Sequence, residues 1–185
     1  MKNTLILISG IPGAGKTSFA EWLAHELSFP LVCYDNIMKK ANEIFSAYGD
    51  DLYRRLMPEI ANHFPYFNVE EIMKTSSPLI YEYFFADMMI PTLDRFVSQY
   101  LYKTINVHFD AEYETAYKRY IKRNNEIGEE MAIRPNDISL EKYIEGVMQN
   151  KTFRYGKNII YVDSTDFSKV SYNDIAEQIR KYASA

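Results

Sequence analysis

A glycine-rich stretch near the start of the chain constrains its fold more than any other feature. Within residues 10–18, the first eight fit the pattern G-x-x-x-x-G-K-[ST] over its full length. The stretch consists of Gly10, Ile11, Pro12, Gly13, Ala14, Gly15, Lys16, Thr17 and Ser18. Its glycines permit positive φ angles and a close backbone approach, so successive N–H groups can converge on phosphate oxygens. Lys16 supplies a cation at the β- and γ-phosphates, and the Thr17 hydroxyl is placed to bind Mg²⁺.

The segments on either side of this loop are those that a phosphate-binding loop requires. An apolar run over residues 4–9 predicts a buried strand before it, and residues 16–27 predict an amphipathic helix after it. A second apolar run, residues 31–33, predicts the strand that completes a β-loop-α-β unit. Such a unit implies a parallel, buried sheet, and the positive end of the helix faces the phosphates. We therefore predict a site for a nucleoside triphosphate.

The totals of the sequence limit the number of domains and the kinds of partner. With 185 residues, of which 47% are hydrophobic, the chain is expected to form one domain over residues 1–185. A net charge of −4 argues against nucleic acid or an anionic membrane as a partner, and no apolar run reaches membrane-spanning length. The single cysteine, Cys33, is interpreted as a small core residue. One cysteine also agrees with a reducing, cytoplasmic location.

Asp35 lies at the end of the second predicted strand, which runs into Tyr34, Asp35 and Asn36. In open α/β sheets the carboxyl ends of the strands form the ligand crevice, so this acid is expected beside the phosphate-binding loop. It is the leading candidate for the group that accepts the proton of a substrate hydroxyl. The alternative is an N-cap for a helix that begins near Ile37, and the two roles are compatible.

The region from residue 36 to residue 100 is expected to be mostly helical and to face the substrate. We predict a helix over 52–64 with a break at Pro58, a loop over 65–68, and a further helix from about Pro78. The aromatic residues at helical spacing in this last segment either belong to the core or line a pocket for a flat substrate. Arg54 and Arg55 either bind an anionic substrate or lie on a solvated helix face.

The second half of the chain predicts two more strands, at residues 104–109 and 158–162, and three more helices, at residues 112–124, 140–150 and 172–182. His108, within the first of these strands, is interpreted as a packed or surface histidine rather than a ligand or a base.

Three arginines form a second candidate constellation. Arg119 and Arg123 are four residues apart on one predicted helix face, and they point towards a polar stretch that contains Arg134. We predict a lid-like segment over residues 119–137 whose cations stabilise the transferred phosphoryl group and help to exclude water. The alternative is a solvated basic face that pairs with neighbouring glutamates.

Together these residues resemble the small P-loop kinases related to shikimate and gluconate kinases, zeta toxins, chloramphenicol phosphotransferase and the kinase domain of polynucleotide kinases. The nearest likeness is to ATP-binding proteins of the predicted-kinase type. Besides residues 10–18, it rests on Asp35 with a lysine following, the helix end 117–124, Arg134-Pro135 and residues 162–165. The resemblance implies a P-loop three-layer α/β sandwich, with a parallel sheet of four or five strands and helices on both faces.

The resemblance also implies roles for individual residues. Asp35 would be the general base, and ATP and Mg²⁺ would be the cofactors. The loop after the last strand would lie beside the adenine of ATP; it consists of Asp163, Ser164 and Thr165.

One departure from the family pattern concerns a third strand. Members have an apolar strand, ending in an acid, between the second and first strands of the sheet. The one candidate we find here is residues 84–90, which fits a helix equally well. Without that strand an acid that supports Mg²⁺ would be lost, although ATP binding would survive.

The sequence therefore predicts an ATP- and Mg²⁺-dependent transfer of the γ-phosphate to a hydroxyl of a small molecule or nucleotide. An alternative is a nucleotide-binding regulator or slow NTPase that has no phosphoryl acceptor, and an absent third strand would favour it. A 5′-polynucleotide kinase is a further possibility, and the negative net charge counts against it.

Overall fold

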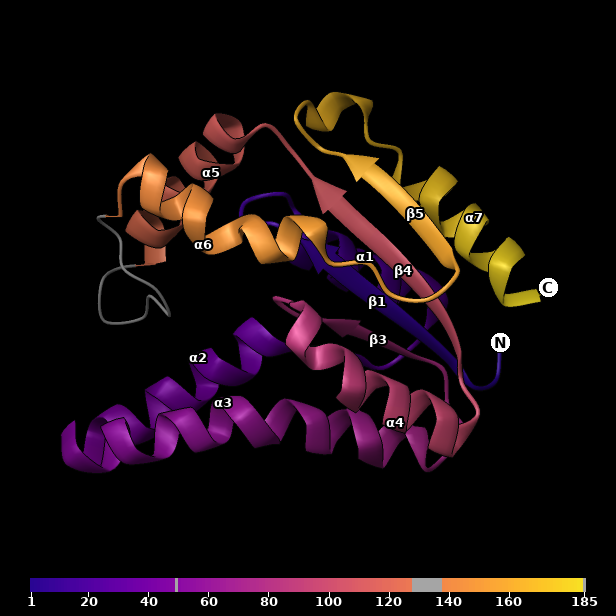
Figure 1. Ribbon diagram of the computed structural model, residues 1–185, viewed down its shortest axis with the longest axis horizontal. Coiled ribbons are helices and arrows are strands. Elements are labelled where there is room, and N and C mark those ends of the chain that lie inside the picture. The colour runs from indigo at the N-terminus through magenta and orange to yellow at the C-terminus, as the bar shows by residue number, and fades with distance from the viewer. Residues whose placement is uncertain (49, 128–137, 185) are drawn as a thin grey trace.

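The computed structural model describes residues 1–48, 50–127 and 138–184, and for residues 46, 50–54 and 127 it describes the backbone alone. The described chain forms a parallel five-stranded sheet in the order β2-β3-β1-β4-β5, with helices on both faces (Figure 1). The strands are β1 Thr4–Gly10, β2 Leu31–Cys33, β3 Leu79–Glu82, β4 Lys103–Asp110 and β5 Asn158–Asp163. The helices are α1 Lys16–Leu27, α2 Tyr34–Phe45, α3 Asp50–Met73, α4 Ile90–Tyr100, α5 Tyr113–Ile127, α6 Leu140–Thr152 and α7 Tyr172–Ser184. The predicted α/β class and sheet are confirmed.

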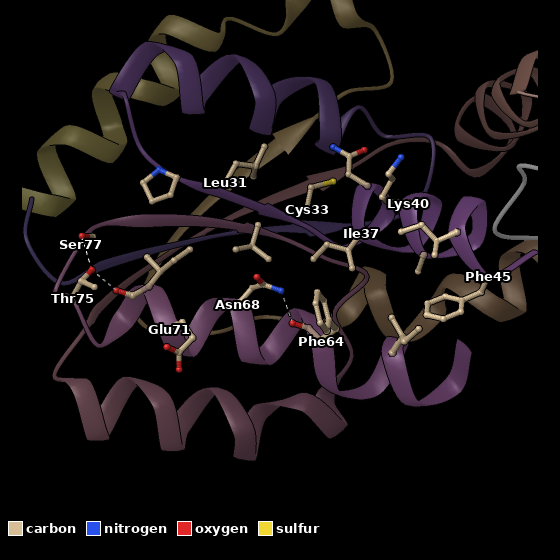
Figure 2. A pocket seen from close by; sticks show the side chains of 17 residues that line it. Leu31, Cys33, Ile37, Lys40, Phe45, Phe64, Asn68, Glu71, Thr75 and Ser77 are labelled. Atoms are coloured by element: carbon tan, nitrogen blue, oxygen red, sulfur yellow. Dashed lines mark hydrogen bonds between the residues drawn. The ribbon is translucent and has the colours of Figure 1, made fainter. Parts of the chain in front are cut away.

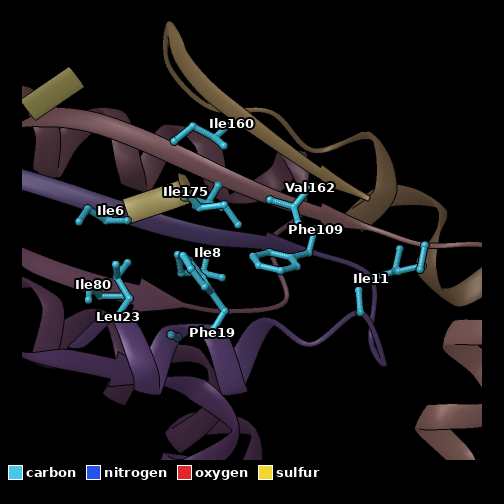
Figure 3. Packing of buried hydrophobic residues seen from close by; sticks show 14 of the residues in the cluster. Ile6, Ile8, Ile11, Phe19, Leu23, Ile80, Phe109, Ile160, Val162 and Ile175 are labelled. Atoms are coloured by element: carbon cyan, nitrogen blue, oxygen red, sulfur yellow. The ribbon is translucent and has the colours of Figure 1, made fainter. Parts of the chain in front are cut away.

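Alternation along the central strand divides the core into two parts. Ile6 and Ile8 of β1 face α1 and α7, where they pack with Phe19 and Ile175 (Figure 3). Leu5 and Leu7 point to the other face and pack in a second cluster with residues of α3 and α4. All seven residues of β1 are buried, which explains why its sequence is a continuous apolar run rather than an alternating one.

The third strand exists, and its sequence-based placement was wrong. β3 lies at Leu79–Glu82, not at residues 84–90, and pairs with both β2 and β1. Its four residues are all buried, so the sequence shows no alternation of apolar and polar residues there. The strand is also short, which weakens the pattern further. Pro78, which we took for the start of a helix, stands directly before the strand, where a missing N–H is tolerated. The region 36–100 is therefore not helical throughout.

The predicted break at Pro58 and the predicted loop over 65–68 are also wrong. α3 is one helix of 24 residues that contains Pro58 and Pro65. Pro65, Val69 and Met73 are buried at four-residue spacing on one side of this helix. Packing of that side against the sheet offsets the hydrogen bonds that the prolines remove. Among the described helices, none combines the length and the apolar character needed to cross a bilayer.

Candidate active site

The phosphate-binding loop joins β1 to α1 and packs tightly against the rest of the sheet. Gly10 and Gly13 have φ angles of 122° and 82°, which side-chain-bearing residues rarely adopt. A Cβ at Gly10 would lie 1.8 Å from the Phe109 carbonyl oxygen, and one at Gly13 would lie 2.1 Å from that of Ala116. The close packing of the loop against β4 and α5 therefore requires glycine at both positions. This requirement is independent of whether a phosphate binds there.

Lys16 is the first residue of α1, and its side chain folds back over the loop. Its Nζ donates a hydrogen bond to the Ile11 carbonyl oxygen at 3.0 Å. The preceding residue, Gly15, has no side chain to cap the helix, so the N-terminal N–H groups of α1 have no side-chain cap. A helix end of this kind, next to a lysine, attracts an anion. Thr17 lies in the same turn and is half-buried.

Glu82, at the end of β3, is a carboxylate that the sequence analysis missed. Its exposed fraction is 3%, and Oε2 accepts a hydrogen bond from the Cys33 thiol at 3.1 Å. Burial raises the pKa of Glu82, while the positive charges of Lys16 and Arg123 act in the opposite direction and Asp35 adds to the rise. Because β2, β3 and β1 are adjacent and parallel, Asp35, Glu82 and Lys16, which end or follow these strands, lie at one edge of the sheet. A short apolar run that ends in an acid, residues 79–82, was the available signal.

Asp35 lies in the first turn of α2 and is half-buried. Because α2 begins at Tyr34, Asp35 is inside the helix, and the N-cap alternative is wrong. Its charge raises the pKa of both Glu82 and Cys33, so it lies within electrostatic reach of the acid whose pKa Lys16 lowers. The neighbours of the two acids in the chain, Tyr34 and Tyr83, have ring centroids 4.3 Å apart.

Arg119 is held by the loop that follows β5. Its guanidinium donates to the carbonyl oxygens of Ser164 at 2.7 Å and Thr165 at 2.9 Å. It also lies over the ring of Phe167 at 3.9 Å from the centroid. That ring touches the phosphate-binding loop, since a Cβ at Gly15 would lie 2.7 Å from it. Arg119 thus borders the loop after β5 rather than the acids.

The other two predicted lid arginines have different outcomes. Arg123 lies near enough to Glu82 for its charge to lower the pKa of that acid. Arg119 and Arg123 therefore share a helix but not a target, contrary to the expectation. Arg134 lies outside the described residues, as does the side chain of Arg54, whereas Arg55 is exposed.

The loop after β5 is tied to the end of β4. Ser164 donates to the Asp110 carbonyl oxygen from its N–H at 2.8 Å and from its hydroxyl at 3.0 Å. Asp163 accepts a hydrogen bond from the Thr165 N–H at 2.9 Å, and the pKa of its carboxyl is lowered by hydrogen bonds from Thr165. These contacts fix the three predicted adenine-side residues next to Arg119.

His108 lies in the core beneath the loop and is confirmed as a packed residue. Its exposed fraction is 0%, and burial together with Arg154 and Lys16 lowers its pKa to about 3. Nη1 of Arg154 is 2.9 Å from Nε2, which must accept, so Nδ1 carries the proton and donates to the Ser9 hydroxyl, also at 2.9 Å. A histidine held neutral between these partners does not act as a base at neutral pH.

The low pKa of His108 predicts acid lability. The stabilising contribution of the neutral ring is complete above the unfolded pKa of 6.5 and is lost as pH falls towards 3. At pH 5 this group alone should lower the free energy of unfolding by about 2 kcal/mol relative to pH 7.5. Denaturant unfolding across this range should show a flatter pH dependence for His108→Gln than for the wild type. His25→Gln, exposed on α1, should keep the wild-type slope; equal slopes for both variants would refute the account.

A cavity of about 990 Å³ lies outside the edge strand β2, between α2 and α3 (Figure 2). Its walls are mostly apolar, with Leu31, Ile37 and Phe64 among the lining residues. Asn36 and Lys40 of α2 line it, but Asp35 does not. Cys33, the hydrogen-bond partner of Glu82, also belongs to the cavity wall.

A comparison with family models matches residues 12–180 to the shikimate kinase family. Among solved structures, a Chloroflexus aurantiacus j-10-fl protein provisionally named a kinase has a TM-score of 0.77 at 22% identity, covering 100% of this chain and 98% of that one. A gluconokinase from Sinorhizobium meliloti 1021 has a TM-score of 0.58 at 13% identity, with coverages of 97% and 91%. A shikimate kinase from Bacteroides thetaiotaomicron has a TM-score of 0.57 at 14% identity, with coverages of 98% and 99%. At these identities the solved structures establish the fold.

Proposed function

This chain belongs to the shikimate kinase family, and we propose that it transfers the γ-phosphate of ATP to a hydroxyl group of a small molecule. The observation that carries the proposal is that a complete phosphate-binding loop shares one edge of the sheet with two acids, Asp35 just after β2 and Glu82 at the end of β3. We propose that residues 1–185 act as a single kinase domain, and the relatives named gluconokinase and shikimate kinase support a small-molecule acceptor.

Each of the candidate residues would have a separate role in the reaction. The loop amides and Lys16 bind the β- and γ-phosphates, and Arg123 and Arg134 neutralise charge on the transferred group. Asp35 orients the acceptor hydroxyl and takes its proton as the oxygen bonds to the γ-phosphorus. The bond from that phosphorus to the β–γ bridging oxygen breaks, and ADP leaves. Arg119 and residues 163–165 would border the adenine.

The residues present also fit Mg²⁺. A threonine hydroxyl at the start of α1 and a buried carboxylate at the end of β3 are oxygen ligands of the kind that Mg²⁺ prefers, with phosphate oxygens completing its shell. Thr17 would bind the ion directly, and Glu82 would orient its ligands. Mg²⁺ would there neutralise charge that develops on the β- and γ-phosphates.

The alternative of a nucleotide-binding regulator or slow NTPase drew its support from an absent third strand. β3 is present and ends in an acid, so that support is gone. A kinase transfers the phosphoryl group to a hydroxyl of an acceptor, whereas an NTPase transfers it to water.

A screen for acceptor-dependent ADP release tests the proposal. The purified protein with Mg-ATP would be supplied in turn with sugars, sugar acids, cyclitols, amino alcohols and nucleosides. We expect at least one compound to raise ADP release about tenfold over ATP alone, since a positioned hydroxyl competes strongly with water. ATP binding with no stimulation by any compound in these classes would count against a small-molecule kinase.

A further inference from the structure

A tyrosine from α6 holds the phosphate-binding loop at a point that no sequence motif identifies. The Tyr143 hydroxyl donates a hydrogen bond of 2.5 Å to the carbonyl oxygen of Pro12, 131 positions away in the chain. The exposed fraction of the Tyr143 side chain is 2%, so this bond is shielded from water. Proline has no N–H, and its carbonyl is the one hydrogen-bonding group that Pro12 has. Tyr143 therefore binds the carbonyl group through which Pro12 can form a hydrogen bond.

The position of the Tyr143 ring is fixed by its surroundings. Ser139 caps α6, since its hydroxyl accepts a hydrogen bond from the N–H of Lys142, and its carbonyl accepts one from the N–H of Tyr143. The ring packs against Tyr117 and Tyr120 of α5, with centroids at 5.5 and 5.6 Å. A side chain already immobilised in this way loses little further entropy when it holds the loop.

The hydrogen bond fixes the orientation of the whole peptide group that joins Pro12 to Gly13. In a planar trans peptide the C=O of one residue and the N–H of the next point in opposite directions. With the Pro12 oxygen directed at Tyr143, the N–H of Gly13 is directed away from it. Gly13 is one of the loop residues whose N–H groups would converge on a phosphate. The orientation of this donor is thus set before any ligand arrives.

Two further contacts within the loop differ in kind from this one. The Ile11 carbonyl oxygen accepts from the Ala14 N–H at 3.3 Å and from Lys16 Nζ at 3.0 Å. Lys16 would give up its bond to Ile11 in order to bind a phosphate. The bond from Tyr143 need not break, because Tyr143 is no part of the phosphate-binding set.

We propose that Tyr143 is a positioning residue for the phosphate-binding loop, and that its hydroxyl raises affinity for the phosphates of ADP and ATP by holding the Pro12 peptide. The proposal deepens the proposed function, since it rests on nucleotide binding at this loop. It does not depend on an acceptor or on turnover.

The test is Tyr143→Phe, which removes the hydroxyl and keeps the ring. We expect the dissociation constant of ADP, measured by calorimetry, to rise about tenfold, or about 1.4 kcal/mol. The KM for ATP should rise by a similar factor, with kcat at saturating ATP within about twofold of wild type. The peptide is held alike in the ground state and the transition state, and a loss of such uniform binding raises KM alone.

Tyr117→Phe is the matched control. The Tyr117 hydroxyl donates to the Ile138 carbonyl oxygen at 2.8 Å, and its ring contacts Tyr143, but that bond does not involve the loop. Both variants should lower Tm by a similar amount, because each loses one hydrogen bond. Only Tyr143→Phe should weaken ADP binding.

Two results would overturn the proposal: an unchanged ADP affinity in Tyr143→Phe, or an equal loss of affinity in both variants. The second would assign the effect to general softening of the α5–α6 contact. Failure to find an acceptor would contradict the proposed kinase function and leave this binding test standing. If wild type binds ADP and Tyr143→Phe binds it equally well, the proposal for Tyr143 is contradicted and the proposed kinase function stands.

Discussion

Replacing Lys16 with alanine is expected to lower kcat/KM for ATP at least about a thousandfold, or about 4 kcal/mol. The lysine is the cation at the start of α1, it lies over the loop, and its charge reaches the buried acid Glu82. Removing it takes away the fixed positive charge that balances charge on the transferred phosphoryl group. Steady-state turnover with saturating acceptor measures the loss.

A second lysine serves as the control for this variant. Lys74→Ala removes an exposed lysine after α3 that pairs with Glu71, and it should keep wild-type kinetics. Because the Lys16 side chain is buried, the Tm of Lys16→Ala should be measured alongside. A folded Lys16→Ala variant that retains activity within about threefold of wild type, roughly 0.65 kcal/mol, would show that its assignment is wrong.

Asp35→Asn is expected to lower kcat by about a hundredfold to ten-thousandfold, with KM for ATP within about threefold of wild type. Asparagine keeps the size of the side chain and its place in the first turn of α2, but it cannot accept the acceptor's proton. The split between kcat and KM separates a proton acceptor from a residue that binds the nucleotide.

Asp174→Asn, which changes an exposed acid in the first turn of α7, is the control for charge alone. It should leave both kinetic parameters unchanged. Were Asp35→Asn instead to raise KM for ATP or the requirement for Mg²⁺ with kcat preserved, Asp35 would belong to the metal and nucleotide site. Glu82 would then be the next candidate for the proton acceptor.

The phosphate-binding loop was predictable because all of its chemistry lies within residues 10–18. Glycines at fixed positions, a lysine and a threonine specify the site locally, and the flanking strand and helix confirm the context. The position of Asp35 followed from the same unit, because it stands one strand further on. In both cases local sequence determines what lies at the carboxyl edge of the sheet.

The third strand was not predictable in the same way. Four residues buried on both faces carry no period, and the sheet partners that make Leu79–Glu82 a strand are β1 and β2, far away in the sequence. Glu82 was missed with the strand that ends in it. Cys33 was correctly interpreted as buried, but its hydrogen bond to Glu82 required knowledge of that pairing.

The spacing of residues along a helix predicted which side chains share a face, but not which parts of the structure they contact. Arg119 and Arg123 lie four residues apart, yet Arg119 is bound by carbonyl oxygens of the loop after β5 and Arg123 lies near Glu82. The bond from Tyr143 to Pro12 joins residues 131 positions apart, and no local pattern reports it. Long-range contacts of this kind are properties of the packed structure.

The fate of the γ-phosphate tests the central claim most directly. Wild-type protein would be incubated with γ-labelled ATP, Mg²⁺ and the compound that most stimulates ADP release, and label would be measured in that compound and in free phosphate. A kinase predicts that most of the label released from ATP is recovered on a hydroxyl of the compound, and that Asp35→Asn abolishes this transfer. Recovery of the label as free phosphate alone, at the same rate with and without the compound, would contradict the account.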